Sequence, residues 1–159
     1  MSSAAETPNA SIHEVEVEWG DLDSLGIVFY PRFFAWADAS AHRMFRGAGL
    51  PLDRLLTERH LSFGLVAASA DFHSPARYAD RLLCCSSVAP VKGRSIRVVH
   101  RMLRATNREP VATLRETRVC MDTSEPGRIR SREIPEDIVA ALRRCESADA
   151  DAPPAVGGR

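Results

Sequence analysis

The chain has 159 residues, a length that suits one domain able to bury about two-thirds of the surface of its unfolded chain. Its 21 basic and 21 acidic side chains balance, which argues against a general nucleic-acid surface or an anionic membrane surface as partner. No apolar stretch approaches the roughly 20 residues of a membrane span, and the N-terminus lacks the pattern of a secretory signal. The four cysteines form no C-x-x-C pair, which favours reduced thiols and a cytoplasmic location.

The first third of the chain predicts a strand, a turn and two helices. Residues 1–11 are small and polar, and we expect a flexible tail there. Residues 12–19 alternate apolar and polar side chains, the pattern of a half-buried strand. A Gly-flanked turn, Gly-Asp-Leu-Asp-Ser-Leu-Gly, follows at residues 20–26. Behind it, apolar side chains recur at spacings of three and four, which predicts a long helix opened by Pro31, and a short helix is expected from Pro51.

The rest of the chain predicts an antiparallel sheet and a last helix. Four strand-like segments follow one another without helices between them, which implies antiparallel neighbours. Ile134-Pro135 is expected to open a helix with acidic residues in its first turn and arginines in its last, an order that complements the helix dipole. The predicted organisation is a tail at 1–11, one α+β domain at 12–146 and a disordered tail at 147–159. The four strand segments are residues 63–73, 81–91, 95–105 and 111–121.

The Gly-flanked turn places two carboxylates, Asp21 and Asp23, between a strand and the start of a helix. Unpaired N–H groups and partial positive charge at a helix start favour chemistry there, and a nearby carboxylate can act as base or nucleophile. Asp is also common in turns because its side chain bonds its own backbone, so a purely structural interpretation stays open. A calcium loop is excluded, because its fifth and twelfth positions would be Leu25 and Arg32 rather than oxygen ligands.

No other motif in the sequence indicates a metal or a nucleophile. The five histidines and four cysteines lack the spacings of a zinc site, and no G-x-S-x-G elbow is present. A Gly-rich phosphate loop is also absent from the sequence. The sequence therefore predicts no metal and no organic cofactor.

The segment from Val17 to Phe45 carries G-D-L-D-S-L-G-I-V-F-Y-P followed by W-A-D, and it closely resembles the active-site segment of 4-hydroxybenzoyl-CoA thioesterases of the hotdog-fold superfamily. The string F-H-S-P-A-R-Y-A-D-R-L, at residues 72–82, is similar to the same family without gaps. The resemblance covers most of residues 15–122. It implies a single hotdog domain, an antiparallel sheet wrapped around one long central helix. It also implies dimers, often assembled into a homotetramer, with active sites shared between subunits.

The resemblance also implies which residues form the site. Asp23 matches the catalytic carboxylate, which either attacks the thioester carbonyl or activates water, and the sequence leaves both open. The amide of Tyr30 is the implied donor to the carbonyl oxygen, because Pro31 has no N–H. Gly26 belongs to the substrate-binding turn, and Asp21 is expected to have a structural role, in which it bonds that turn.

Three further residues are implied by the same resemblance. Asp38, in the W-A-D of the helix, is expected to support the site without taking part in the reaction. Lys92 and Arg94 lie in a hairpin where family members often place basic residues that touch CoA phosphates, and a solvated turn is an equal alternative. Pro31 stands where a related branch carries a His, which favours the hydroxybenzoyl-CoA-like branch.

The sequence therefore predicts a thioester hydrolase that acts on acyl-CoA, with an aromatic acyl group such as hydroxybenzoyl or benzoyl favoured. Two alternatives stay open: release of an acyl group from an acyl-carrier protein, and a non-catalytic hotdog protein that binds acyl-CoA. The presence of Asp23 and Gly26 argues against the second alternative. The lack of a DNA-binding module argues against a regulator.

Overall fold

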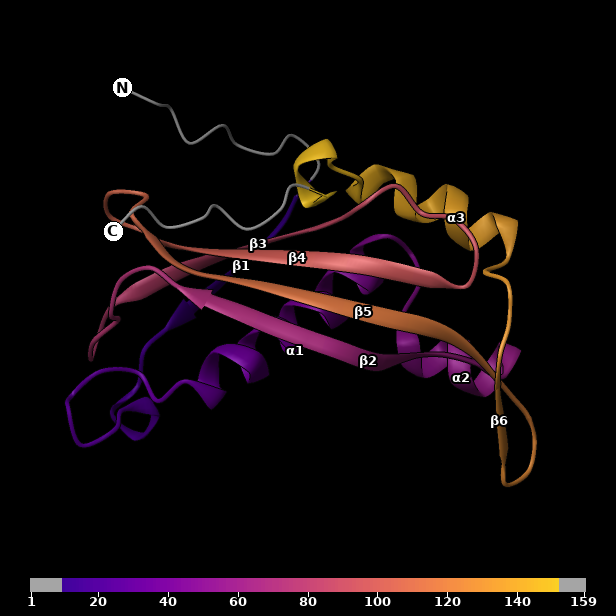
Figure 1. Ribbon diagram of the computed structural model, residues 1–159, viewed down its shortest axis with the longest axis horizontal. Helices are drawn as coiled ribbons and strands as arrows, with labels where there is room; N and C mark the ends of the chain where they lie inside the picture. The colour runs from indigo at the N-terminus through magenta and orange to yellow at the C-terminus, as the bar shows by residue number, and fades with distance from the viewer. Residues whose placement is uncertain (1–9, 152–159) are drawn as a thin grey trace.

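The computed structural model describes residues 10–151, and Figure 1 shows their arrangement. Parts of both predicted tails, residues 1–9 and 152–159, lie outside the described residues. Short 3-10 turns at Trp19–Asp21, Arg143–Cys145 and Ala148–Asp151 accompany the longer elements. These longer elements are β1 (Ser11–Glu16), α1 (Pro31–Gly47), α2 (Leu52–Arg59), β2 (Leu61–Phe72), β3 (Arg81–Val88), β4 (Ser95–Arg104), β5 (Pro110–Glu125), β6 (Arg128–Ser131) and α3 (Glu136–Leu142).

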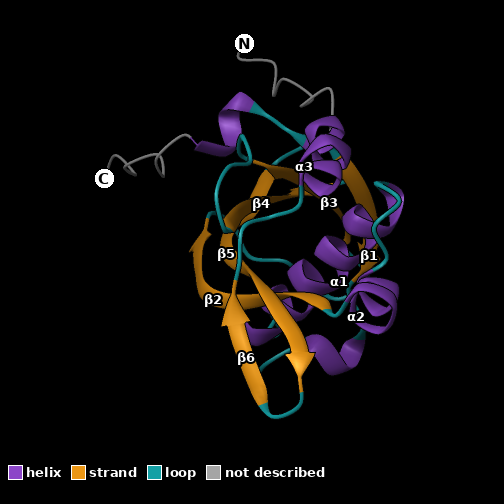
Figure 2. Ribbon diagram, turned by 90° about the vertical axis from the view of Figure 1, so that its right-hand side faces the viewer, coloured by secondary structure: helices purple, strands orange, loops and turns teal. Residues whose placement is uncertain are grey.

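All six strands belong to one antiparallel sheet in the order β1-β3-β4-β5-β2, with β6 paired to the end of β5. The strands β3, β4 and β5 pair with their neighbours in the chain, as the sequence predicts. The strand β2 instead pairs with β5 and forms one edge of the sheet. Figure 2 shows the curled sheet with α1 on its concave side, which confirms the predicted α+β layout of a sheet around one long helix.

Two short elements were not predicted. The strand β6 is exposed along its whole length, so no alternation of apolar and polar residues marks it in the sequence. Residues 148–151, which the sequence assigns to a disordered tail, form a 3-10 turn in the structure. Ala150 is buried there against Ala89 and Val99, and this small apolar contact accounts for the local order.

The helix α1 packs closely on the sheet because the centre of its buried face is made of small residues. Ala37, Ser40 and Ala41 are each at most 1% exposed and separate the larger Phe33 from Met44 and Phe45. Small side chains allow the helix backbone to approach the sheet, and the larger ones fill the space at either end. The helix begins at Pro31, whose missing N–H suits the first helical position.

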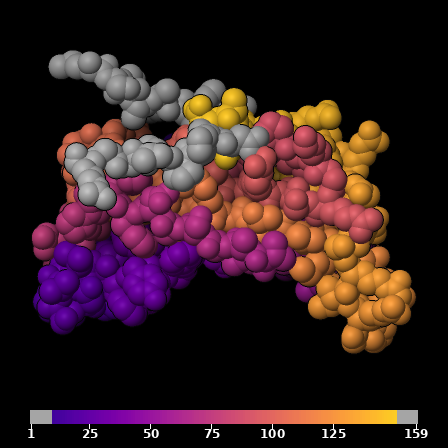
Figure 3. Space-filling view, in the orientation of Figure 1, coloured from indigo at the N-terminus to yellow at the C-terminus, as the bar shows by residue number. Residues whose placement is uncertain are grey.

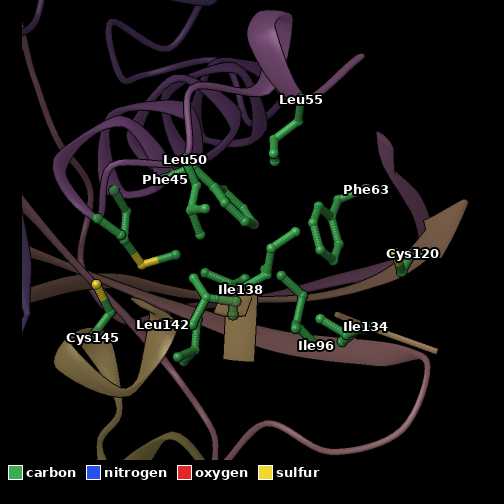
Figure 4. Packing of buried hydrophobic residues seen from close by; sticks show 14 of the residues in the cluster. Phe45, Leu50, Leu55, Phe63, Ile96, Cys120, Ile134, Ile138, Leu142 and Cys145 are labelled. Atoms are coloured by element: carbon green, nitrogen blue, oxygen red, sulfur yellow. The ribbon is translucent and has the colours of Figure 1, made fainter. Parts of the chain in front are cut away.

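The core under α1 is divided into two apolar clusters. The first lies toward the C-terminal end of α1, and Figure 4 shows its side chains from α1, β2, β4 and α3 pointing toward one another. The second lies toward the N-terminal end of α1 and contains Phe33, Leu82, Met102 and Leu114. On the sheet, the two clusters are separated by four buried polar side chains: Ser86 on β3, His100 on β4, and Glu116 and Arg118 on β5.

Replacing Phe45 with Ala is expected to destabilise the fold strongly. Phe45 is 0% exposed and its ring centroid lies 5.3 Å from that of Phe63. Removal of a buried aromatic ring costs about 3–5 kcal/mol of unfolding free energy, because transfer energy is lost and a cavity remains. Urea titration followed by circular dichroism measures this change. Ile129→Ala, at a position 67% exposed, is the matched control and should change the unfolding free energy by less than about 0.5 kcal/mol.

Candidate active site

The turn before α1 is a small closed loop held by backbone hydrogen bonds. The Asp23 N–H donates to Ile27 O at 2.9 Å, and the Gly26 N–H donates to Asp23 O at 3.0 Å. Leu22 and Val28 form an isolated antiparallel bridge at its base. Gly26 has φ of +71°, in the left-handed region where a residue with a Cβ is strained. The backbone therefore fixes the direction in which Asp23 leaves the turn.

The Asp23 carboxylate is half-buried and held by one of its two oxygens. Its Oδ1 accepts a hydrogen bond from the Leu25 N–H at 2.8 Å. Within the described part of the chain, Oδ2 has neither a hydrogen bond nor an ion pair. A carboxylate with one oxygen fixed and the other available has the geometry that a general base or a nucleophile requires.

Asp21 connects the turn to the residues before and after it. Its Oδ2 accepts a hydrogen bond from the Glu18 N–H at 2.9 Å, and its Oδ1 lies 3.3 Å from Arg32 Nε. Its backbone oxygen accepts the Phe29 N–H at 2.8 Å. The Asp21 side chain is only 13% exposed. With both carboxylate oxygens engaged, Asp21 joins the turn to the start of α1.

The Tyr30 amide lies at the N-terminus of α1, next to this turn. The first two helical amides are engaged, since Arg32 N–H donates to Phe29 O at 2.9 Å and Phe33 N–H donates to Tyr30 O at 3.1 Å. The Tyr30 N–H donates to none of residues 10–151, and Pro31 has no N–H to offer. An unengaged amide at the positive end of a helix suits the stabilisation of developing negative charge.

Asp38 lies two helical turns further along α1, and its partner comes from the sheet. Its Oδ1 accepts a hydrogen bond from Arg118 Nη2 at 2.8 Å and lies 3.7 Å from His42 Nε2. The Asp38 side chain is 57% exposed, whereas that of Arg118 is 4% exposed. Arg118 was not among the site residues predicted from the sequence. The sequence does carry one indication of its position. Every second residue of a strand points to the same face, so Glu116 and Arg118 point inward with Leu114 and Cys120.

Arg118 also forms part of a cleft of about 640 Å³ between the second half of α1, α2 and the start of β2. His42 and Arg46 of α1 line one side, and Ser62 and Phe63 of β2 line another. His42 follows Pro31 by 11 residues, so the cleft lies about 17 Å along the helix from its start, at 1.5 Å per residue. Within one chain, the cleft and the Asp23 turn are therefore separate.

The basic hairpin is also distant from the Asp23 turn. Gly93 O accepts the Ile134 N–H, and Arg94 Nη1 donates to Ser131 O at 3.3 Å, so the hairpin lies beside β6. Arg94 O accepts the Cys120 N–H, next to the strand pair that begins β2. Lys92 is exposed in the same hairpin. Figure 3 shows the indigo segment that contains the Asp23 turn and the orange β5–β6 hairpin at opposite ends of one face.

Two general features of the described residues bear on the class of protein. Between residues 10 and 151, no helix is both long and apolar enough to cross a membrane. In that same part of the chain, no three or more His, Cys, Asp or Glu side chains gather as metal ligands would.

The curled antiparallel sheet around α1 defines the hotdog class of fold. The model of the thioesterase-like superfamily matches residues 17–142. The 4-hydroxybenzoyl-CoA thioesterase of Pseudomonas sp. (strain CBS-3) is 31% identical over 77% of this chain and 90% of its own. This chain therefore belongs to the thioesterase-like superfamily, and the resemblance read from the sequence is confirmed.

Further relatives agree with this assignment. The acyl-CoA thioester hydrolase YbgC of Escherichia coli O6:H1 is 25% identical over 82% of this chain and 93% of its own. A mutant 4-hydroxybenzoyl-CoA thioesterase solved with 4-hydroxybenzoyl-CoA superposes with a TM-score of 0.78, at 27% identity, over 84% of this chain and 99% of that chain. A gentisyl-coenzyme A thioesterase gives a TM-score of 0.71, at 26% identity, over 84% of this chain and 99% of that chain.

Replacing Asp21 with Ala is expected to lower stability more than turnover. The change removes the acceptor of the Glu18 N–H and the partner of Arg32, and loss of such a capping contact costs about 1 kcal/mol of unfolding free energy. Thermal melts and thioester turnover measure the two effects together. The exposed Glu16 on β1 offers the control, Glu16→Ala. Loss of turnover in a protein that melts like the wild type would contradict a structural role for Asp21.

Proposed function

We propose that this protein is an acyl-CoA thioesterase in which Asp23 acts on the thioester carbonyl or on water. The observation that carries the proposal is the presence of two available groups at and just before the start of α1. These are the Asp23 carboxylate with one unengaged oxygen and the Tyr30 N–H with no acceptor among the described residues. Membership of the thioesterase-like superfamily supports the same reaction class.

The reaction follows from these two groups. The thioester carbonyl oxygen accepts the Tyr30 N–H, which stabilises the negative charge that develops when the carbonyl carbon is attacked. In one route Asp23 takes a proton from water, and the resulting hydroxide adds to the carbon as the thiolate of CoA leaves. In the other route an Asp23 oxygen adds to the carbon and expels the thiolate, and water then hydrolyses the anhydride. In both routes the proton that water releases passes to the thiolate, so the products are a carboxylic acid and the CoA thiol.

The substrate class that we favour is an aromatic acyl-CoA. Exposed aromatic rings gather near the start of α1, with Phe29 48% exposed, Tyr30 59% exposed and Phe72 52% exposed. The Phe72 ring lies 5.4 Å from that of Phe33, and the Phe29 ring lies 5.5 Å from that of Tyr30. Aromatic side chains pack well edge-on or offset against another ring, so such a surface favours an aryl group over a flexible alkyl chain. A panel of acyl-CoA thioesters, with kcat/KM for each, tests this preference, and matched acyl-carrier substrates test the alternative.

We further propose that the active unit is a dimer formed through β2, with a tetramer as the expected assembly. The free edge of β2 carries exposed Leu65 and Val66, at 52% and 55%, in the middle of the strand. An unpaired edge with apolar side chains favours pairing with a second strand, and a two-fold axis makes that pairing antiparallel. Lys92 and Arg94 lie at the end of the sheet opposite Asp23, so their proposed contact with CoA phosphates requires the partner's catalytic turn.

The cytoplasm is the compartment that we propose. The four cysteines, all among the described residues, form no disulfide. Burial raises the pKa of the Cys84 thiol to about 11, against smaller opposing effects of Ser40 and Ser86. Protonated buried thiols are stable in a reducing environment and need no oxidising compartment.

Asp23→Asn is expected to lower kcat at least about a hundredfold, the usual lower scale for loss of a positioned acid–base group. The amide keeps the shape of the side chain but is neither a competent base nor a nucleophile, so the melting temperature and CoA binding should stay near wild type. Single-turnover rates and thermal melts measure both. Ser24→Ala, in the same turn, is the control. Near wild-type turnover by Asp23→Asn would refute the proposed role of the carboxylate.

Leu65→Lys is expected to convert the protein into monomers and to abolish turnover. A charge in the middle of the apolar β2 edge opposes pairing with a second copy. Light scattering should change from a multiple of 17.5 kDa to 17.5 kDa, with turnover lost in parallel. Ile129→Lys, on exposed β6, adds the same charge elsewhere and should preserve both. An active monomer would be the contrary result.

A further inference from the structure

The row of polar side chains that divides the core has no part in the reaction described above. Ser86 Oγ lies 2.7 Å from His100 Nδ1, and His100 Nε2 lies 3.5 Å from Glu116 Oε2. The same Glu116 oxygen accepts a hydrogen bond from Arg118 Nε at 2.9 Å. All four side chains are buried. A buried ion pair is often no more stabilising than apolar side chains of the same volume, so stability alone does not account for this row.

The row of buried polar side chains reaches the surface through Arg118, which contacts the exposed Asp38 on α1. Burial alone would raise the pKa of Glu116, but the polar His100 ring nearby and the hydrogen bond and charge of Arg118 outweigh it and hold the pKa below its ordinary value. Glu116 is therefore an anion that holds the Nε side of the guanidinium. The Nη2 of Arg118 is left to donate to Asp38 at 2.8 Å. A planar guanidinium held at one edge fixes the position of a carboxylate at its other edge.

The proposed dimer brings this surface to the catalytic turn of a second copy. The Phe72 end of β2 lies at the start of α1, because the Phe72 ring is 5.4 Å from that of Phe33. The opposite end of β2 supplies Ser62 and Phe63 to the cleft that Arg118 lines. Antiparallel pairing about the middle of β2 places each Phe72 end beside the other chain's Ser62 end. The start of α1 in one copy then lies beside the cleft of the other copy.

We propose that Arg118 is a positioning residue of the thioesterase, which acts through Asp38 on the site formed with the catalytic turn of a second copy of the chain. This inference rests on the proposed function and on the proposed dimer. Glu116, which lies beside His100, holds Arg118, and Arg118 holds Asp38. Asp38 then forms a fixed wall against which the acyl group is aligned for attack at the partner's turn. Alignment errors of about 1 Å can lower a rate by about a hundredfold, so a residue that only fixes this wall can have a large effect on kcat.

The first test compares Arg118→Met, Asp38→Asn and the double variant in steady-state kinetics. Arg118→Met should lower kcat about ten- to a hundredfold, the range expected from misalignment, with KM changed much less. If Arg118 acts through Asp38, adding Arg118→Met to Asp38→Asn should cause no further loss. Arg115→Met, on the outer face of the same strand, removes a pair with Asp71 and is the matched control. Unchanged kcat in Arg118→Met, or losses that simply add in the double variant, would overturn the proposal.

Arg118→Met leaves the Glu116 charge buried and unpaired, which could prevent folding. The variant Glu116→Gln/Arg118→Met is therefore measured beside it. Removal of both charges avoids an uncompensated buried carboxylate, so the double variant should fold even if the single variant does not. Its kcat should fall as far as that of Arg118→Met. A folded double variant with wild-type kcat would overturn the proposal.

The second test is complementation between two impaired variants, co-expressed with different tags. In a hybrid of Asp23→Asn and Arg118→Met chains, one of the two shared sites combines Asp23 of one chain with Arg118 of the other. Random assembly should then restore about a quarter of wild-type turnover, because half of the dimers are hybrids with one intact site of two. No recovery in purified hybrids would show that Arg118 does not serve the partner's turn. Turnover by Asp23→Asn alone would refute the carboxylate mechanism instead, independently of Arg118.

Discussion

The close approach of α1 to the sheet is the constraint on which the rest of the structure depends. Ala37, Ser40 and Ala41 have too little side chain to hold the helix away, and all three are almost completely buried. A large side chain at any of them would force the helix outward, because a close-packed interior cannot absorb the added volume. The position of α1 in turn sets the position of its N-terminus, which the Asp23 turn and the Tyr30 amide directly precede.

The rigidity of that N-terminus explains why so few groups are needed for the proposed chemistry. The Asp23 turn is closed by its own backbone, and Asp21 joins it to Arg32 in the first turn of the helix. A carboxylate and an amide held on one rigid unit need little reorganisation when charge develops on the substrate. Aromatic side chains on the same unit supply the apolar surface. The groups proposed to orient the substrate and those proposed to react with it therefore belong to one rigid unit.

Much of the fold could be predicted from the sequence, and so could the residues of the candidate site at the start of α1, because both depend on local patterns. The stripe on α1 and the alternation in β3, β4 and β5 appear within single segments, and the Gly-Asp-Leu-Asp turn carries its motif in consecutive residues. The pairing of β2 with β5 depends on contacts between residues far apart in the chain, and the local pattern favoured neighbouring strands instead. The contact between Arg118 and Asp38 spans 80 positions, so neither segment alone indicated it.

The polar row that divides the core also gives Asp38 on α1 a partner from the sheet. An entirely apolar core would leave Asp38 on α1 without a fixed partner, since an exposed helical carboxylate moves freely in solvent. Arg118 of the sheet donates a hydrogen bond to that carboxylate, and in the proposed dimer the free edge of β2 determines which surface a second copy contacts. One strand pair, β2 with β5, thus supplies both the edge of the proposed dimer and the arginine of the proposed positioning role. A change in the register of that pair would move the edge and the arginine relative to each other and should disrupt both proposed roles.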